Sequence, residues 1–189
     1  MRKPGQNSAY FGTEKRILNA LSSILRDRSS VHIKVKDVAS VAGIASSSFY
    51  IHYKSLDDVI SRNEHRIVNG VTHIIKTELV KNSSPAEIMK KSLYFLYRHR
   101  DYLDIVGYSC NVKFSIAVIM CLLPVLEKSW PKYPEEIRRK LENMLVLECC
   151  AELNLWWNEK FSFNKIAEHA GHLVYISVAT PKIYASKYA

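Results

Sequence analysis

The sequence predicts an all-α protein with a small N-terminal three-helix bundle and a larger C-terminal helical domain. Apolar residues recur at helical spacing through most of the 189 residues. Alternating strand-like patterns are almost absent, and six glycines leave few tight loops. We expect the first domain over residues 1–55, with a flexible basic arm over 1–12, and the second over 56–189.

The first helix is expected to open at Thr13, after the arm. Its apolar stripe falls at i, i+4, i+7 and i+8 and consists of Ile17, Leu21, Ile24 and Leu25. Such a basic arm either enters a minor groove of DNA or is a disordered terminus.

The stretch from Val35 to Val59 organises the chain and reads as two short helices joined by a tight turn. Val38, Ala39 and Ala42 give the first short helix an apolar face. Gly43 stands where that helix must end, and glycine adopts the left-handed conformation of a helix C-terminus without a Cβ clash. Phe49 lies on the second short helix and can pack back on the first. This is the pattern of a helix-turn-helix unit.

The second short helix combines an apolar inner face with an outer face of hydrogen-bonding groups, which suits a DNA groove. Ser47 and Ile51 are the predicted base contacts, since Ile51 can meet a thymine methyl group. Lys36 is expected near the DNA backbone. The predicted DNA-binding residues are Lys36, Ser46, Ser47, Ser48, Tyr50, Ile51, His52 and Lys54.

This segment resembles the DNA-binding domain of the TetR family of bacterial transcriptional regulators over roughly fifty residues, from Glu14 to about Arg66. The matching residues are Val38-Ala39, Ala42-Gly43-Ile44, Phe49-Tyr50, His52-Tyr53 and Ser55. Ala45, Ser47 and Leu56 depart from the usual serine, glycine and lysine. The resemblance implies that Ser48, Tyr50 and His52 touch the DNA backbone, and that the protein is a ligand-responsive repressor.

Downstream, the spacing predicts a long helix from the N-cap Ser55 to about Val80, followed by a break at residues 81–85. A helix over 86–100 and a short piece from Asp101 come next. Residues 113–128 predict a buried helix that Pro124 kinks or ends. Two more helices are expected, one from Pro134 and one from Asn164 that ends before Pro181.

The last two helices carry more apolar surface than one partner helix needs, and Ala167, Ala170 and Gly171 allow close approach. In the resembling family the final helices of two subunits form a four-helix bundle, so we expect a homodimer on a palindromic operator. The alternative is that both helices pack only within their own domain.

The family resemblance also implies a small-molecule effector in the second domain. Candidate lining residues are Tyr94, Tyr97, Tyr102, Phe114, Met120 and Trp156. Apolar pockets with a few polar groups suit such ligands, although aromatic residues at helical spacing are also typical of a core.

The net charge of +9 favours an anionic partner, and +5 of it falls within residues 1–66. No apolar run approaches the roughly 20 residues that a membrane helix needs, and the chain opens without a secretory signal. The four cysteines lack metal-ligand spacing and are expected to be reduced thiols. We therefore expect a cytoplasmic protein.

No enzyme or cofactor signature appears. The chain lacks a nucleophile elbow, a phosphate loop and a zinc motif, so we expect neither catalysis nor a cofactor. His169 and His172 stand at i and i+3, which permits metal binding, but no carboxylate or cysteine pattern lies beside them, and we expect no metal site. The alternative function is a helical interaction or sensor protein that has lost specific DNA binding.

Overall fold

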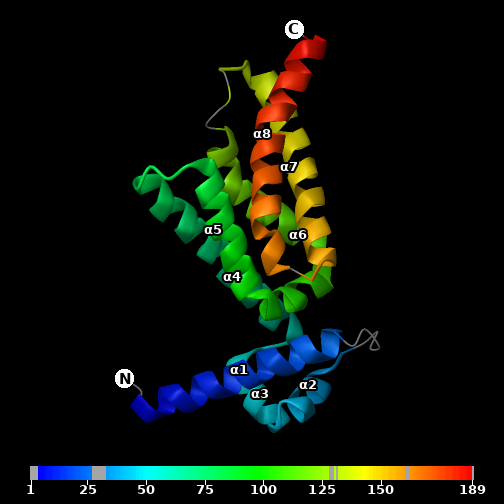
Figure 1. The fold of residues 1–189 in the computed structure, drawn as a ribbon. Coiled ribbons are helices and arrows are strands. Elements are labelled where there is room, and N and C mark those ends of the chain that lie inside the picture. The colour runs from blue at the N-terminus through cyan, green and yellow to red at the C-terminus, as the bar shows by residue number, and fades with distance from the viewer. Residues whose placement is uncertain (1–3, 27–32, 128–129, 131, 161, 189) are drawn as a thin grey trace. The chain divides into compact units, whose positions relative to one another are not determined.

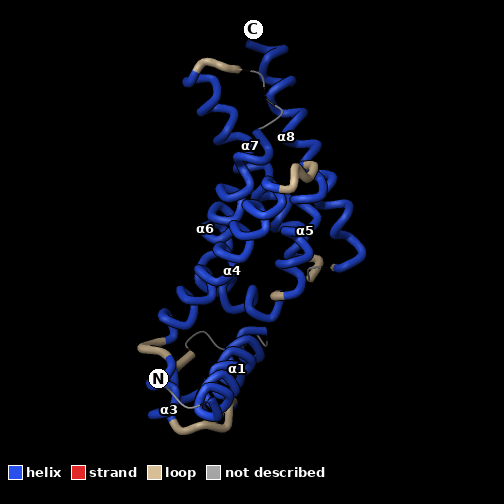
Figure 2. The backbone as a smooth tube through the Cα atoms, turned by 90° about the vertical axis from the view of Figure 1, so that its left-hand side faces the viewer, coloured by secondary structure: helices blue, strands red, loops and turns tan. Residues whose placement is uncertain are grey.

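Every regular element in the described part of the chain is helical, and Figure 2 shows no strand there. The structure is a computed structural model that describes residues 4–26, 33–127, 130, 132–160 and 162–188. The all-α prediction is confirmed. None of the described helices has a stretch long and apolar enough to cross a bilayer.

The helices divide into two units, each built from two stretches of chain (Figure 1). The first unit comprises Met1–His65 and Arg100–Cys110, and the second comprises Arg66–His99 and Asn111–Ala189. The sequence predicts a single boundary after residue 55, with residues 100–110 in the second domain. The helices are α1 (Pro4–Arg26), α2 (Val35–Val41), α3 (Ser46–His52), α4 (Leu56–Val80), α5 (Pro85–Arg98), α6 (Arg100–Leu126), α7 (Glu135–Asn158) and α8 (Ile166–Tyr188).

Helix α1 begins at Pro4, so the predicted start at Thr13 and the flexible arm over residues 4–12 are wrong; residues 1–3 lie outside the described part. Proline suits the first turn of a helix because its missing N–H would have no partner there. Thr13 lies inside the helix and donates its hydroxyl to the carbonyl of Ala9 at 3.1 Å. The sequence analysis missed this extension because residues 4–12 carry no apolar stripe of their own.

One apolar core holds the first unit together. Phe49 of α3, Val38 of α2 and Val59 of α4 are fully buried in it, as is Ile105 of α6. Ile17, Leu18 and Leu21 supply the α1 side, and Ile24 and Leu25 pack against this core partly buried, which confirms the predicted apolar stripe. The start of α6 therefore completes the core that α1 to α4 form.

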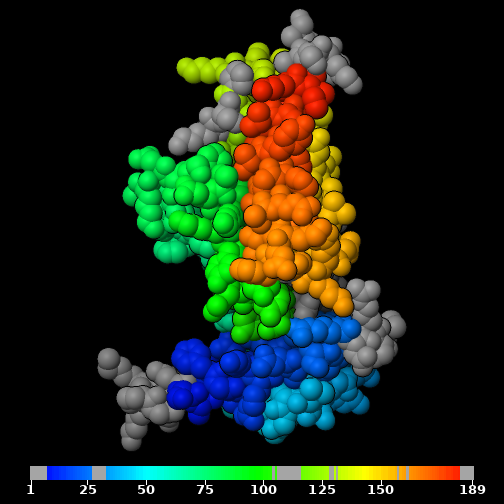
Figure 3. Space-filling model, viewed as in Figure 1, coloured from blue at the N-terminus to red at the C-terminus, as the bar shows by residue number. Residues whose placement is uncertain are grey.

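In the second unit, α8 packs against both α5 and α7. In Figure 3, α8 (orange to red) forms much of the visible surface of this unit. The fully buried side chains include Ile88, Leu93, Val118, Leu122, Leu141, Leu145, Trp156 and Leu173. Helix α5 approaches α4 closely at Gly70, where an added Cβ would lie 2.1 Å from the ring of Phe95. The unit is thus a helical bundle with α8 as a shared partner.

Cys149 and Cys150 of α7 are buried and unpaired, which agrees with the expectation of reduced thiols. Burial raises the pKa of Cys149 to about 12. A thiol that resists ionisation is a poor nucleophile and a poor metal ligand at neutral pH. The side chain of Cys110 lies outside the described part of the structure.

Helix α6 is one continuous helix of 27 residues, whereas the sequence predicted a short piece at Asp101 and a separate helix over 113–128. Pro124 falls in the last turn, and α6 ends two residues later at Leu126. Proline lacks an N–H, and its ring meets the carbonyl of Met120, four residues earlier. Because α6 ends at Leu126, this disturbance is confined to the end of the helix. The predicted effect of Pro124 therefore holds, and the predicted break before residue 113 is wrong.

Helix α8 continues through Pro181 to Tyr188, so the predicted end before Pro181 is also wrong. Proline has no N–H, and the carbonyl of Ser177, four residues earlier, loses its usual donor in the helix. The indole Nε1–H of Trp130 donates to that carbonyl at 2.7 Å. A side chain from 47 residues upstream thus satisfies the group that Pro181 leaves without a helical partner.

A cluster around Glu78 fixes the turn between α4 and α5. Asn82 has a left-handed backbone with φ of 56°, which lets α4 end there. The Glu78 carboxylate accepts from the Ser83 hydroxyl at 2.7 Å and from the ammonium of Lys81 at 3.1 Å, and it pairs with Lys91 of α5. Lys91, Ser83 and Lys81 together lower the pKa of Glu78 to about 2.

This lowered pKa makes part of the stability of the second unit dependent on pH. Because the folded-state pKa lies below the ordinary value of 4.5, the stabilisation is fully present above about pH 4.5 and is lost as the pH falls toward 2. We expect Glu78→Gln to lower the thermal midpoint at pH 7 and to change it much less at pH 2. Equal shifts at both pH values would show that the carboxylate charge is not what stabilises the turn.

Candidate nucleic-acid interface

The turn between α2 and α3 has the hydrogen bonds of a helix ended by a left-handed residue. Gly43 has φ of +64°, as the sequence predicted. The N–H of Gly43 donates to the carbonyl of Ser40 at 3.1 Å, and the N–H of Ile44 donates to that of Ala39 at 3.0 Å. These two bonds form a Schellman motif, which satisfies carbonyls that the helix end would otherwise leave open. Helix α3 can therefore start at Ser46 in a fixed direction.

Helix α3 has one buried face and one exposed face. Phe49 is fully buried, whereas Ser46, Ser47 and Tyr50 are exposed and Ile51 is 68% exposed. Ser48 is half-buried. An isoleucine this exposed contributes little to folding, and its contact with a base edge stays a prediction.

Two predicted lysines are exposed on either side of α3 in the sequence. Lys36 lies in the first turn of α2 and Lys54 follows α3, and both side chains are exposed. The Lys54 backbone N–H donates to Asp58 at 2.8 Å, and the Asp58 N–H donates to the Ser55 hydroxyl at 3.2 Å. The predicted N-cap role of Ser55 is confirmed, and the backbone that carries Lys54 is fixed.

Tyr53 connects the end of α3 to two other helices. Its hydroxyl donates to the Glu14 carboxylate of α1 at 3.1 Å, and the Arg62 guanidinium of α4 lies 5.3 Å from its ring centre. Arg62 also pairs with Asp58 at 2.9 Å. The backbone N–H of Lys54, followed by Arg62, lowers the pKa of Asp58, which keeps the pair charged. These contacts hold α3 in place against α1 and α4.

His52 differs from the other predicted contact residues because its side chain is packed inside the unit. It is 7% exposed, and its ring lies 4.1 Å from that of Tyr10. Its Nδ1 is buried without a hydrogen-bond partner among the described residues. Burial lowers the pKa of His52, against an opposing effect of Glu14, which favours the neutral ring. The structure thus gives His52 a packing role and identifies Tyr10, which the sequence analysis placed in the arm, as its partner.

The predicted effector-pocket residues do not form one group. Tyr94 and Tyr97 of α5 lie together against Phe163, at ring distances of 6.1 and 5.2 Å. Tyr102 packs against the core of the first unit, so its placement in a second-domain pocket is wrong. Met120 is exposed on α6, and Trp156 is fully buried and donates to the carbonyl of Ser162 at 3.1 Å. The side chain of Phe114 lies outside the described part of the structure.

The structure adds one cluster that the sequence analysis excluded. His169 and His172 of α8 both lie beside the Glu152 carboxylate of α7. The statement that no carboxylate accompanies these histidines is therefore wrong. Glu152 is 17 residues before His169, and only the packing of α7 on α8 brings them together.

No family model matches the chain. The chain is similar to an uncharacterized HTH-type transcriptional regulator, YwcC, of Bacillus subtilis (strain 168), with 26% identity over 109 residues. The matched region covers 53% of this chain and 49% of that protein. The chain thus spans about half the length of the curated relative that it matches.

Proposed function

We propose that this protein is a DNA-binding transcriptional regulator of the TetR type that acts as a homodimer on a palindromic operator. The observation that carries the proposal is the α2–turn–α3 unit, in which Gly43 directs α3 and Phe49 anchors it. This leaves Ser47, Tyr50 and Ile51 uncovered. The similarity to an HTH-type transcriptional regulator supports the same class of function.

In this proposal α3 lies in the major groove. Ser47 and Ile51 face base edges, while Ser46, Ser48 and Tyr50 lie near the phosphates with Lys36 and Lys54. Serine discriminates weakly between bases, so part of the specificity comes from DNA shape. His52 acts indirectly here, since its packing on Tyr10 fixes the end of α3.

The exposed apolar residues of α7 and α8 support the homodimer. Met144, Leu147, Ala151 and Leu155 of α7 are all exposed and follow each other at spacings of three or four residues. On α8 the exposed positions Ala167, Gly171, Tyr175 and Val178 do the same, while Ala170 is buried. Apolar stripes at this spacing fit the interface of a four-helix bundle from two copies. Dimerisation would place two recognition helices roughly 34–36 Å apart, one helical turn of DNA.

A small-molecule effector in the second unit would regulate DNA affinity by favouring one arrangement of the dimer. Helix α4 is the element that would carry the change, because it runs without interruption from the first unit into the second. The loss of operator affinity cannot exceed the ratio of the effector's affinities for the two states, the one that does not bind DNA and the one that does. Tyr94, Tyr97 and Phe163 mark an aromatic surface suited to an apolar ligand.

Fluorescence anisotropy with DNA from the upstream region of the protein's own gene tests the proposal. We expect preference over scrambled DNA and a steep loss of affinity with salt. The double variant Tyr50→Ala/Lys54→Ala should weaken binding at least about tenfold. It should also lower the slope of log affinity against log salt concentration by about two, because each subunit of the dimer loses one lysine–phosphate contact. Lys90→Ala is the matched control, since it removes an exposed lysine from α5 in the second unit and should leave binding unchanged.

The alternative is a helical interaction or sensor protein without specific DNA binding. It predicts weak binding that is equal for operator and scrambled DNA, with the same salt slope for the double variant and the wild-type protein. Genome-wide pull-down then separates an operator elsewhere in the genome from a protein that has no target sequence.

A further inference from the structure

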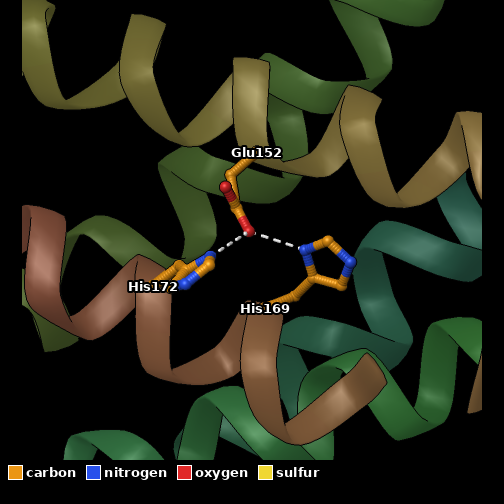
Figure 4. Close-up of side chains that lie close together, drawn as sticks. All are labelled: Glu152, His169 and His172. Atoms are coloured by element: carbon orange, nitrogen blue, oxygen red, sulfur yellow. Dashed lines mark hydrogen bonds and ion pairs between the residues drawn. The ribbon is translucent and has the colours of Figure 1, made fainter. Parts of the chain in front are cut away.

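Glu152, His169 and His172 meet between α7 and α8 with their polar atoms directed at one point (Figure 4). The two histidines are one helical turn apart on α8, and Glu152 faces them from α7. Glu152 Oε1 lies 2.6 Å from His169 Nδ1 and 3.0 Å from His172 Nδ1. The three potential ligand atoms all lie within 4.8 Å of one another.

This cluster is buried on one side and open on the other. Glu152 is 7% exposed and His169 is 4% exposed, whereas the His172 side chain is exposed. A buried carboxylate needs charged or hydrogen-bonding partners, because its desolvation is unfavourable. The open side at His172 gives an ion from solvent a path to the buried oxygen.

The hydrogen bonds around His169 match those of a metal-binding histidine. Its Nε2 lies 3.2 Å from the Glu159 carboxylate, on the side of the ring opposite Glu152. A neutral imidazole has one N–H, so it can donate to only one of these two carboxylates. Without an ion, a proton must lie between Nδ1 and Glu152 Oε1, which are 2.6 Å apart; once that proton leaves, Nε2–H donates to Glu159 and the lone pair of Nδ1 is available to an ion. Metal-bound histidines usually donate their second N–H to such a carboxylate.

Glu159 is held in a state that suits this role. Lys165 lies 3.3 Å from its other carboxylate oxygen. Its carboxylate thus contacts His169 with one oxygen and Lys165 with the other. Glu159 therefore fixes the orientation of the His169 ring.

The donor set selects for one class of ion. Two imidazole nitrogens and one carboxylate oxygen suit Zn²⁺ and related divalent transition metals, while Mg²⁺ and Ca²⁺ prefer sites made of oxygen ligands. Bond lengths of about 2.0–2.1 Å at a tetrahedral ion separate its ligand atoms by about 3.3–3.5 Å. The two Glu152 distances are shorter than this, so the ligand atoms must move apart on binding: the exposed His172 ring has room to move, and the Glu152 carboxylate must turn away from His169.

We propose that Glu152, His169 and His172 form a binding site for a divalent transition-metal ion such as Zn²⁺, with Glu159 as the positioning residue of His169. Three protein ligands leave a further position for water or another exchangeable group. The ion replaces the hydrogen-bond protons between the carboxylate and the two rings, so its binding releases protons and links α7 to α8.

Isothermal titration calorimetry of the full chain with Zn²⁺ tests the proposal. The wild-type protein should bind one ion per chain, with heats that depend on buffer ionisation because protons are released. Co²⁺ should give the visible absorption bands of a bound four- or five-coordinate ion, and Mg²⁺ should not compete. We expect His172→Ala and Glu152→Gln each to weaken Zn²⁺ binding at least about tenfold, and Glu159→Gln to weaken it about 10- to 100-fold.

Controls separate loss of the site from loss of the fold. His172→Ala leaves Glu152 its hydrogen bond to His169, so this variant should stay folded in EDTA with a midpoint at or modestly below that of the wild-type protein, while Zn²⁺ should raise the midpoint of the wild-type protein only. His73→Ala removes an exposed histidine of α4 in the same unit and should leave Zn²⁺ affinity unchanged. The proposal is overturned if the wild-type protein binds no Zn²⁺, or if His172→Ala and Glu152→Gln bind it as tightly as His73→Ala does.

Discussion

Phe49→Ala should lower the free energy of unfolding of the first unit by about 3–5 kcal/mol, the usual effect of removing a fully buried aromatic ring. Phe49 is the side chain that anchors α3 in a core built from five helices, and its ring lies near those of Tyr50 and Tyr53. The resulting cavity would loosen α3, so we expect operator binding to fall together with stability.

The distribution of tryptophan makes this effect measurable unit by unit. Trp130, Trp156 and Trp157 all belong to the second unit, so tryptophan fluorescence reports on that unit, while circular dichroism reports on all helices. We expect urea unfolding of Phe49→Ala to begin earlier by circular dichroism. Phe11→Ala is the matched control, because it removes an exposed phenylalanine of α1 and should shift neither signal. An unchanged midpoint for Phe49→Ala would contradict the burial of this ring.

Leu147→Glu should convert the proposed homodimer into monomers. Leu147 of α7 is 69% exposed and lies within the exposed apolar stripe of that helix. Burying an unpaired carboxylate at an interface is strongly unfavourable, whereas in a monomer the same carboxylate remains in water. We therefore expect a monomer by sedimentation at micromolar concentration. Its thermal midpoint should not depend on protein concentration, because unfolding is no longer linked to dimer dissociation. Operator affinity should fall at least about 100-fold when the second half-site contact is lost.

Val80→Glu provides the control for this variant. Val80 is the last residue of α4 and is 84% exposed, so the substitution introduces the same charge at an exposed apolar position outside α7 and α8. It should leave both oligomeric state and DNA affinity unchanged. If Leu147→Glu remains a dimer, the subunits associate through another surface, and the assignment to α7 and α8 fails.

Local signals predicted the part of the fold that lies closest to the candidate interface. Gly43 marks the end of α2, and Ser55 caps α4 through a hydrogen bond to Asp58. The apolar spacing predicted α4 as far as Val80, where the structure ends it. Each of these features depends on residues within one or two helical turns, so a single sequence is enough to identify them.

The errors arise where a distant residue decides the local structure. Helix α8 passes Pro181 because Trp130 donates to the Ser177 carbonyl, and no pattern near Pro181 indicates this. Ile105 is buried in the core of the first unit, although the sequence suggested only a short piece there. Such contacts depend on tertiary packing, which overrides local preference.

The same distinction applies to the candidate sites. Helical spacing correctly separated the buried Phe49 from the exposed Tyr50 and Ile51, because one face of a short helix must be buried. It failed for His52, whose partner Tyr10 lies on a stretch expected to be unstructured. It also failed for Glu152, which meets His169 only through the packing of α7 on α8.

The division of the chain into two interleaved units affects how such a protein can change by recombination. The first unit needs residues 100–110, and Ile105 among them is fully buried in its core. A single crossover after residue 65 would transfer α1 to α3 and the start of α4 without residues 100–110, so the recipient's own residues there would have to pack against a core that they do not match. Exchange of a DNA specificity between related regulators would therefore succeed more readily by substitutions on the outer face of α3 than by transfer of the whole N-terminal segment.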